Sequence, residues 1–488
     1  KNIGPEEAEI FDAHLMMLED PDFVEGMTNE IADESVCAEF ACMVNCENFQ
    51  AMFRAMDDEY MQARAADIGD ISMRVLKNLK GIAENPLDTI TEPCIVVAND
   101  LTPSDTAKMG GKPVVGFITK IGGRTSHSAI MARSMGIPAV VGAGEKLDPI
   151  EDGMELLIDG AAGELIAQPD EPTLAAFEEK KEKDDARRAM LAKFRDRPGE
   201  TSDGRRIIIE GNIGTPSDAV RVMELGGEGV GLFRSEFLYL QGSDYPTEDE
   251  QFEAYKTVAE RMGGKRVIIR TLDIGADKQA DYFHLDKEEN PAMGLRAIRI
   301  CLTRPEVFRT QLRALYRASA YGKIAIMFPM ITSVWEVQEI KRICRNIRAE
   351  LAEEGVPMAD KVELGIMIET PAAVMMSAEL AREVDFFSVG TNDLTQYTLA
   401  VDRQGVGLDR FFDAHHPAVL RMIRMAAENA HKAGIWIGIC GELGADAELT
   451  ETFLSMGIDE LSVSPSAVLP LRSAIRSIDT TTLAPLEL

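Results

Sequence analysis

One histidine lies in a stretch whose residue types could make its ring a nucleophile. The stretch is GGRTSHSAIMARSMGIPAVVG, residues 122–142, and the histidine is His127. The two glycines predict a tight turn, and Thr125 or Ser126 could cap the short helix that follows. At a helix start, free backbone N–H groups and the helix dipole favour an anion and disfavour an imidazolium. The pattern therefore predicts a neutral imidazole beside an anion site, although a histidine near a cap is also compatible with a simple polar position.

Two acidic residues follow consecutive apolar segments in the second half of the chain. Glu369 ends the string VELGIMIE, and Asp393 ends the string VDFFSVGTND. If these segments are neighbouring parallel strands, the two carboxylates lie close enough to share a divalent cation. Mg²⁺ suits such a pair because it takes oxygen ligands and keeps waters that substrate oxygens can replace. Buried ion pairs with arginines are the alternative interpretation of these two acids.

Several arginines lie on segments that could meet at the same place as the acidic pair. They are Arg234, Arg270, Arg296 and Arg403. A guanidinium group binds the oxygens of phosphates and carboxylates in pairs. One such arginine is usually a surface residue, but four beside a metal pair predict a small ligand that carries both a phosphate and a carboxylate.

A cysteine could supply the proton chemistry of this site. Cys440 lies in the string IWIGICGELG, where the neighbouring glycines would let a ligand approach the sulfur. Near arginines and a metal, we expect the thiol to have a lowered pKa and to donate or accept a proton. An inert buried cysteine is the other interpretation of this residue.

These chemical residues share one place in a repeated pattern of apolar strand, loop and amphipathic helix. Eight strand candidates follow residue 204, in the strings RRIIIEGNIG, GVGLFRSEF, RVIIRTLDIG, IAIMFPMI, VELGIMIETP, VDFFSVGTND, IWIGICGE and IDELSVSP. The pattern predicts a closed (β/α)8 barrel, known as a TIM barrel. The chemical residues fall at or just beyond the strand ends that form the catalytic face of such a barrel: Arg234, Arg270, Glu369, Asn392, Asp393 and Cys440.

Two further regions and a linker precede this pattern. Residues 1–85 show helical apolar spacing, and residues 86–170 alternate short apolar runs with glycine-rich turns. Residues 171–200 are dense in charge, with acid–base pairs spaced i, i+4, and predict an exposed linker helix. We therefore expect a multidomain α/β protein with a helical subdomain, a small α/β domain that carries His127, a linker helix and a C-terminal barrel over residues 201–488.

Composition limits the partners of the chain. The 488 residues contain 82 Asp and Glu against 51 Lys and Arg, a formal net charge of −31. Such a charge repels nucleic acid and anionic membranes and attracts a basic protein. Seven irregularly spaced cysteines fit a reducing compartment, and we expect Cys37, Cys42 and Cys46 to be buried apolar residues. Because the sequence has neither a bilayer-length apolar run nor a signal-peptide pattern, we expect a cytoplasmic protein without membrane insertion.

The sequence resembles Enzyme I of the bacterial phosphoenolpyruvate-dependent sugar phosphotransferase system. The resemblance covers nearly the whole chain and rests on the strings DLTPSDTA, GGRTSHSAIMAR, GVGLFRSEFL, RTLDIGADK, NPAMGLRAIR, MFPMI, ETPAA, FFSVGTNDLTQYTLAVDR and CGELGAD. It implies a phosphotransferase that moves the phosphoryl group of phosphoenolpyruvate (PEP) onto a histidine and releases pyruvate. The histidine then passes the group to a histidine of the carrier protein HPr, as the first step of sugar uptake.

The resemblance also implies roles for individual residues and regions. His127 would carry the phosphoryl group, Cys440 would protonate enolpyruvate, and Glu369 and Asp393 would hold Mg²⁺, with Asp393 also beside the substrate. HPr would dock on residues 1–85, and the barrel would bind PEP and form a homodimer. The remaining residues that the resemblance places near the substrate are Arg234, Arg270, Asn392, Arg403, Arg296 and Lys278.

The chain departs from this family in two places, and two other functions are compatible with its motifs. Ser235 stands where the family usually has threonine in an RTEF string, and the substitution keeps the hydroxyl. A strand and a helix that precede EAEIFDAHLMMLED in the family are lacking, so we expect an N-terminally incomplete docking subdomain.

A pyruvate phosphate dikinase or PEP synthase would carry a large nucleotide-binding domain before the histidine domain. A regulatory protein that only senses PEP would need neither His127 nor Cys440.

Overall fold

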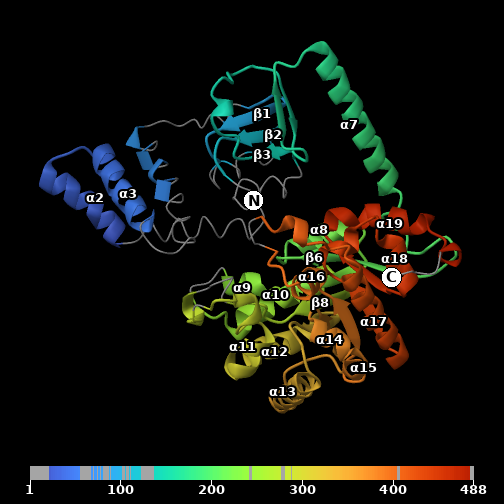
Figure 1. The fold of residues 1–488 in the computed structure, drawn as a ribbon. Helices are drawn as coiled ribbons and strands as arrows, with labels where there is room; N and C mark the ends of the chain where they lie inside the picture. The colour runs from blue at the N-terminus through green and yellow to red at the C-terminus, as the bar shows by residue number, and fades with distance from the viewer. Residues whose placement is uncertain are drawn as a thin grey trace. The chain divides into compact units, whose positions relative to one another are not determined.

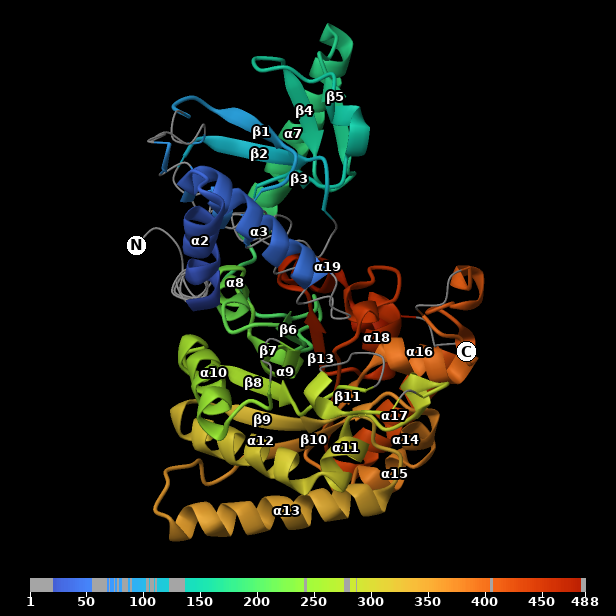
Figure 2. The ribbon, with the colours of Figure 1, turned by 90° about the vertical axis from the view of Figure 1, so that its left-hand side faces the viewer.

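The computed structural model describes residues 21–54, 90–101, 112–122, 137–240, 244–275, 281–286, 288–403 and 407–483, with short stretches and single residues between 68 and 109. The chain divides into two compact units, Lys1–Lys183 and Asp184–Leu488, which are described separately (Figures 1 and 2). His127, the helix predicted around it, and Lys278 lie outside the described residues.

The first unit begins with two packed helices, α2 (Pro21–Glu34) and α3 (Ala38–Arg54). Phe23 packs edge to face on Phe49, with ring centroids 5.3 Å apart, and the start of α2 is tied to α3 by a hydrogen bond from Asn45 Nδ2 to Phe23 O. Cys42 and Cys46 are buried as predicted, but Cys37 is exposed. The reason is that Cys37 precedes the first residue of α3 and lies outside its apolar face.

A small sheet and a hairpin follow in the same unit. The parallel sheet contains β1 (Cys94–Ala98), β2 (Val114–Thr119) and β3 (Ala139–Val140), and the antiparallel hairpin contains β4 (Leu156–Asp159) and β5 (Glu164–Ala167). Gly122 has a φ of 115°, which suits glycine, and the rest of the turn predicted from the glycine pair lies outside the described residues. Helix α7 (Glu171–Ala192) has no buried side chain, in keeping with its charged sequence.

The second unit is built on a closed barrel of eight parallel strands, which confirms the predicted TIM barrel (Figure 2). The strands are β6 (Ile208–Ile213), β7 (Gly229–Arg234), β8 (Arg266–Arg270), β9 (Ile324–Phe328), β10 (Glu363–Ile368), β11 (Phe386–Val389), β12 (Trp436–Ile439) and β13 (Glu460–Val463). Each strand lies in one of the eight predicted strings. β13 pairs with β6, and this pairing closes the barrel.

Helices surround the barrel and cover the outer face of its strands (Figure 1). They are α8 (Asp218–Glu224), α9 (Glu236–Leu240), α10 (Glu248–Arg261), α11 (Ile298–Thr303), α12 (Pro305–Ala318), α13 (Val334–Glu353), α14 (Pro371–Met375), α15 (Ser377–Leu380), α16 (Thr391–Leu399), α17 (Pro417–Ala433), α18 (Thr450–Met456) and α19 (Val468–Ser477). The largest apolar core lies between strands and helices, while a second, smaller core fills the inside of the barrel and includes Leu232, Ile268, Met327, Phe386 and Cys440.

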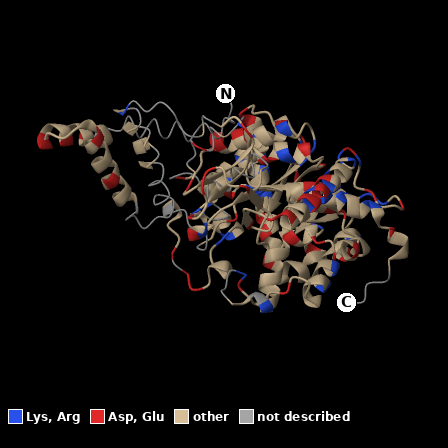
Figure 3. Cartoon of the chain, turned by 90° about the horizontal axis from the view of Figure 1, so that it is seen from above, with Lys and Arg blue, Asp and Glu red and all other residues tan. Residues whose placement is uncertain are grey.

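Short 3₁₀ helices complete the described structure. They are η2 (Gly144–Leu147), η3 (Asp281–Phe283), η4 (Pro291–Met293), η5 (Ser319–Tyr321), η6 (Asp409–Phe411), η7 (Glu442–Ala445), η8 (Pro465–Ala467) and η9 (Thr480–Thr482). Figure 3 shows acidic residues on the helices of both units, mixed with Lys and Arg on the barrel unit. None of the helices in the described ranges is long and apolar enough to cross a bilayer.

The first turn of α10 allows a test of barrel stability. Thr247 Oγ1 accepts a hydrogen bond from Glu250 N at 3.3 Å, and Glu250 Oε2 accepts one from Thr247 N at 2.7 Å. We predict that Thr247→Ala lowers the free energy of unfolding by about 1 kcal/mol. The Glu250 N–H loses its acceptor, and the Glu250 carboxylate that accepts from Thr247 N is no longer held by the threonine hydroxyl. Denaturant unfolding followed by circular dichroism measures the loss. The control Thr310→Ala, inside α12, should change stability by less than about 0.5 kcal/mol, and an equal loss in both variants would contradict the capping argument.

Candidate active site

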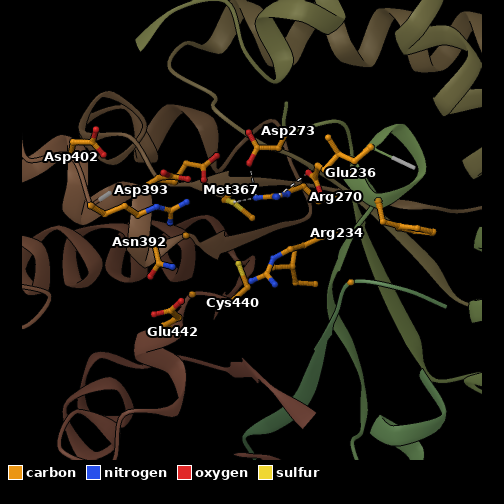
Figure 4. A pocket seen from close by; sticks show the side chains of 18 of the residues that line it. Arg234, Glu236, Arg270, Asp273, Met367, Asn392, Asp393, Asp402, Cys440 and Glu442 are labelled. Atoms are coloured by element: carbon orange, nitrogen blue, oxygen red, sulfur yellow. Dashed lines mark hydrogen bonds and ion pairs between the residues drawn. The ribbon is translucent and has the colours of Figure 1, made fainter. Parts of the chain in front are cut away.

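A cavity of about 930 Å³ opens at the carboxyl ends of the barrel strands. Figure 4 shows side chains from several strand ends pointing into it. Because parallel strands of a closed barrel all end at one face, residues far apart in the sequence meet there. The predicted site residues that line the cavity are Arg234, Arg270, Glu369, Asn392, Asp393, Arg403 and Cys440.

Arg270, at the end of β8, is held by two acids at the bottom of the cavity. Its Nη2 lies 2.9 Å from Glu236 Oε1 and its Nη1 lies 2.9 Å from Asp273 Oδ2. Burial alone would lower the pKa of Arg270, but the charges of Asp273 and Glu236 outweigh burial and raise it. The guanidinium is therefore permanently charged and fixed in direction before a ligand binds.

Arg296 does not line the cavity, but it contacts Asp273, which does. Its Nη2 lies 2.8 Å from Asp273 Oδ1, so one carboxylate holds Arg270 and Arg296 at the same time. Arg296 is buried and follows η4, next to Ala297, whose φ of 52° is unusual for a residue with a side chain. A strained backbone at this point sets the direction in which the arginine leaves the chain.

Arg234 is a cation of the cavity that remains available for an anion. Within the described ranges its guanidinium has no ion pair and no hydrogen bond, and it lies close to Cys440 (Figure 4). Burial and the like charge of Arg270 lower the pKa of Arg234, while Glu236 acts in the opposite direction. An anionic ligand between the two arginines would relieve this repulsion.

Glu369 and Asp393 lie at the ends of neighbouring strands, as predicted. Both are buried, and Glu369 Oε1 accepts a hydrogen bond from Met330 N at 2.6 Å. Met330 has a φ of 57°, so a strained backbone aims this N–H at the carboxylate. On the other side, a Cβ atom at Gly390 would come within 2.9 Å of Glu369 Oε2, and only glycine leaves room for the carboxylate.

The acid pair has the properties of a cation site. Burial and the neighbouring carboxylates Asp393 and Asp273 together raise the pKa of Glu369 to about 8, because Arg270 and Arg296 offset them only in part. Asp393 Oδ1 is buried without a hydrogen-bond partner among the described residues. A divalent cation between the two side chains would satisfy this oxygen and let both acids ionise. The residues therefore fit a metal ion that is bound through oxygen.

Cys440 departs from the expectation of a lowered pKa. It is buried, and its Sγ lies 3.6 Å from Val389 O. Burial raises the pKa of the thiol to about 12, because Ser388 and Arg270 only partly offset it while Glu460 and Glu369 add to it. The sequence expectation is wrong because it counted the nearby arginines and neglected the dry barrel interior. The thiol keeps its proton at neutral pH and is suited to donate it.

Two further acids of the site were not identified from the sequence. Glu236 follows Arg234 in the string FRSEF, and Asp273 follows Arg270 in the string RTLDIG. Their signal was present, because each acid lies two or three residues after an arginine at a strand end. The role of these acids could not be predicted, because they can pair with arginines of other chain segments, as Asp273 pairs with Arg296.

The comparisons with known proteins define the class. Family models of the PEP-utilising enzymes match the chain in three parts: the N-terminal domain over residues 1–64, the mobile domain over residues 90–163 and the PEP-binding domain over residues 188–480. A chain with these three parts is a PEP-utilising enzyme. Members of this class use a metal ion, which agrees with the acid pair of the barrel.

Similar proteins define the family more narrowly. The phosphoenolpyruvate-protein phosphotransferase of Priestia megaterium is 47% identical over 485 residues, covering 99% of this chain and 85% of the relative. The protein of the same name from Bacillus subtilis (strain 168) is 47% identical over 478 residues, covering 98% and 84%. A solution structure of Enzyme I (nEIt) is 44% identical and covers 38% of this chain and 74% of that one, with a TM-score of 0.33. The chain belongs to the phosphoenolpyruvate-protein phosphotransferase family.

The raised pKa of Glu369 predicts a coupling between metal and protons. We predict that binding of Mg²⁺ at pH 7 releases about one proton, because Glu369 is protonated in the metal-free protein and must ionise to bind. Calorimetric titration in two buffers of different ionisation enthalpy measures the release. The control Glu353→Gln changes an exposed acid at the end of α13, outside the cavity, and should leave the release unchanged. Binding without proton release would contradict the assignment.

Proposed function

We propose that this chain moves the phosphoryl group of PEP onto His127, releases pyruvate, and passes the group to a histidine of the carrier HPr as the first step of sugar uptake. The observation that carries the proposal is a barrel mouth with fixed arginines, a buried acid pair and a protonated thiol, in a chain 47% identical to phosphoenolpyruvate-protein phosphotransferases. PEP carries a phosphate and a carboxylate on three carbons, and the arrangement of charges suits such a ligand.

The arginines bind and orient the ligand. Arg234 and Arg403 offer guanidinium groups to the phosphate, and Asn392, in the first turn of α16, offers an amide beside them. Arg270 and Arg296 are held in place by Asp273 before the ligand arrives. Because these groups do not reorganise on binding, their electrostatic stabilisation is available to the transferring phosphoryl group.

Glu369 and Asp393 are the residues that would hold Mg²⁺. The ion supplies neutralisation of negative charge on the phosphoryl group when it is bound. His127 attacks the phosphorus in line with the leaving enolate oxygen, carried there by the mobile domain. The bond between phosphorus and the enolate oxygen breaks as the bond to nitrogen forms. Cys440 then gives its proton to the methylene carbon of the enolate, and pyruvate results.

The first unit supplies a surface for a basic carrier. Helices α2 and α3 expose acidic side chains, among them Glu25, Asp33 and Glu47, and apolar ones, among them Val24, Ile31, Phe40 and Met43. Acidic charge steers a basic partner, and the apolar side chains give it a surface to bury. This supports docking of HPr on residues 1–85. A homodimer through the barrel and a cytoplasmic location belong to the same proposal.

A first test addresses the phosphoryl carrier. We predict that PEP labelled in its phosphate transfers an acid-labile label to the protein in the presence of Mg²⁺, and that His127→Ala abolishes labelling. PEP binding at the barrel should persist in this variant, because the arginines and the acid pair are unchanged. Labelling by quench and filter assay, with binding by calorimetry, measures both. Persistent acid-labile label in His127→Ala would sink the assignment, as would label that depends on ATP.

A second test addresses the proton donor. We predict that the protein with Mg²⁺ exchanges the methyl protons of pyruvate with deuterated water, and that Cys440→Ala slows the exchange by roughly 10²- to 10⁴-fold, the usual worth of general acid–base assistance. NMR follows the loss of the methyl signal. His127→Ala serves as the control and should exchange at the normal rate. Equal rates in the wild-type protein and Cys440→Ala would remove the thiol from the mechanism.

A further inference from the structure

Two glutamates lie inside the barrel, where the proposed phosphoryl transfer does not use them. Glu210 on β6 and Glu460 on β13 are buried, and the nearest cation among the described residues is Arg266, whose Nη2 lies 3.2 Å from Glu210 Oε1. The Arg266 guanidinium also stacks on the ring of Trp436, 4.0 Å from its centroid. One arginine balances one carboxylate, so the second acid in this dry space must carry a proton.

The two acids interact directly. One oxygen of Glu210 and both oxygens of Glu460 are buried without a partner among the ordinary hydrogen-bond donors of the described chain. A proton on either acid would turn it into a donor to the other. Burial raises the pKa of both groups, that of Glu460 well above its usual range, and the negative charge of Glu210 adds to the effect on Glu460. The charged groups that face the pair are Arg266, Glu228 and Asp459, and Cys440 is the neutral titratable group nearby.

A glycine lets Glu460 extend toward Cys440. In the strand register, Gly438 on β12 lies between Glu460 on β13 and Ser388 on β11. A Cβ atom at Gly438 would overlap Glu460 Oε2, so the carboxyl group occupies the space that a side chain would fill on β12. Cys440 follows Gly438 by two residues, and alternate residues of a strand share a face. The Glu460 carboxyl group therefore lies inside the barrel at the level of Gly438, one inward-facing position before Cys440.

Ser388 lies across Gly438 from Glu460 in the strand register. Its hydroxyl is buried, interacts with the Cys440 thiol and has no conventional hydrogen-bond partner within the described part of the chain. The backbone around the thiol is fixed as well, because Asn212 Nδ2 donates to Cys440 O at 2.9 Å and to Ser462 O at 3.1 Å. The hydroxyl thus interacts with the thiol, and in the strand register only the position of Gly438, which has no side chain, separates it from Glu460.

We propose that Glu460 and Glu210 share one proton, and that this pair returns a proton to Cys440 through Ser388 after the thiol has protonated the enolate. The inference rests on the proposed function. As the thiol S–H bond breaks, a C–H bond forms on the product. The Ser388 hydroxyl proton then moves to sulfur, and the shared acid proton moves to the Ser388 oxygen. The doubly ionised pair opposite Arg266 is short-lived, because a proton from a cavity water passes along the thiol and the hydroxyl to the pair, and the hydroxide that forms leaves through the cavity.

The first test asks for the shared proton and needs no substrate. We expect infrared spectra of the Mg²⁺-bound protein at neutral pH, in which Glu369 is ionised, to contain the carbonyl band of a protonated carboxylic acid that disappears in both Glu460→Gln and Glu210→Gln. Either change leaves one acid opposite Arg266, and that acid ionises. The matched control is Glu363→Gln, an acid on β10 that acts on Arg266 but lies outside the pair. If the band is absent from the wild-type protein, or survives in both variants, the shared proton does not exist.

The second test asks whether the proton reaches the thiol. We expect Ser388→Ala to slow exchange of the pyruvate methyl protons on the order of 10²-fold while it keeps the infrared band, and Glu460→Gln to slow exchange and lose the band. Ser388→Ala leaves the acids untouched, so the relay can be tested even if a glutamate variant folds poorly. Normal exchange in Ser388→Ala, with exchange still dependent on Cys440, would overturn the relay and leave the proposed function standing. Exchange that does not depend on Cys440 would instead overturn the relay and also remove the thiol from the proposed mechanism.

Discussion

The burial of like charges at one end of the barrel is the constraint on which the site depends. Glu369 is 1% exposed and lies beside Asp393 and Asp273, in a place where water cannot screen their repulsion. The free-energy cost of burying these charges is offset because Arg270 and Arg296 share Asp273, and because the remaining two acids can bind a cation. Removal of any one charge leaves its partners unbalanced, so the site has to be regarded as a single electrostatic unit.

The same burial of charge divides the arginines of the site into those that are paired with acids and those that can bind a ligand. Arg270 and Arg296 are occupied by acids and form a rigid support, whereas Arg234 lies near another cation and has no ion pair with any acid that the structure describes. A ligand phosphate thus meets Arg234, which needs an anion, beside arginines that are already fixed. This division favours a ligand with a concentrated negative charge over a neutral analogue of the same shape.

Much of this arrangement could be predicted from the sequence, because the closed barrel fixes where strand ends meet. The apolar strings identified all eight strands, and the chemical residues after them line one cavity. The pKa of Cys440 could not be predicted, since it depends on groups from other strands, such as Ser388 and Glu460, whose inward direction is set by register. Asp273 was missed for a related reason, because its role is a contact with Arg296 across a loop.

The stacking of Arg266 on Trp436 makes the fluorescence of this tryptophan sensitive to charge inside the barrel. The chain has two tryptophans. Trp335 is 60% exposed on α13, whereas Trp436 lies between the Arg266 guanidinium and the parallel ring of Phe386, whose centroid is 4.6 Å away. An indole emits according to the charges around it, and Trp436 is in contact with the cation that balances the buried acids. Its fluorescence can therefore be separated from that of Trp335 with a water-soluble quencher, and a change of charge inside the closed barrel becomes visible without any added label.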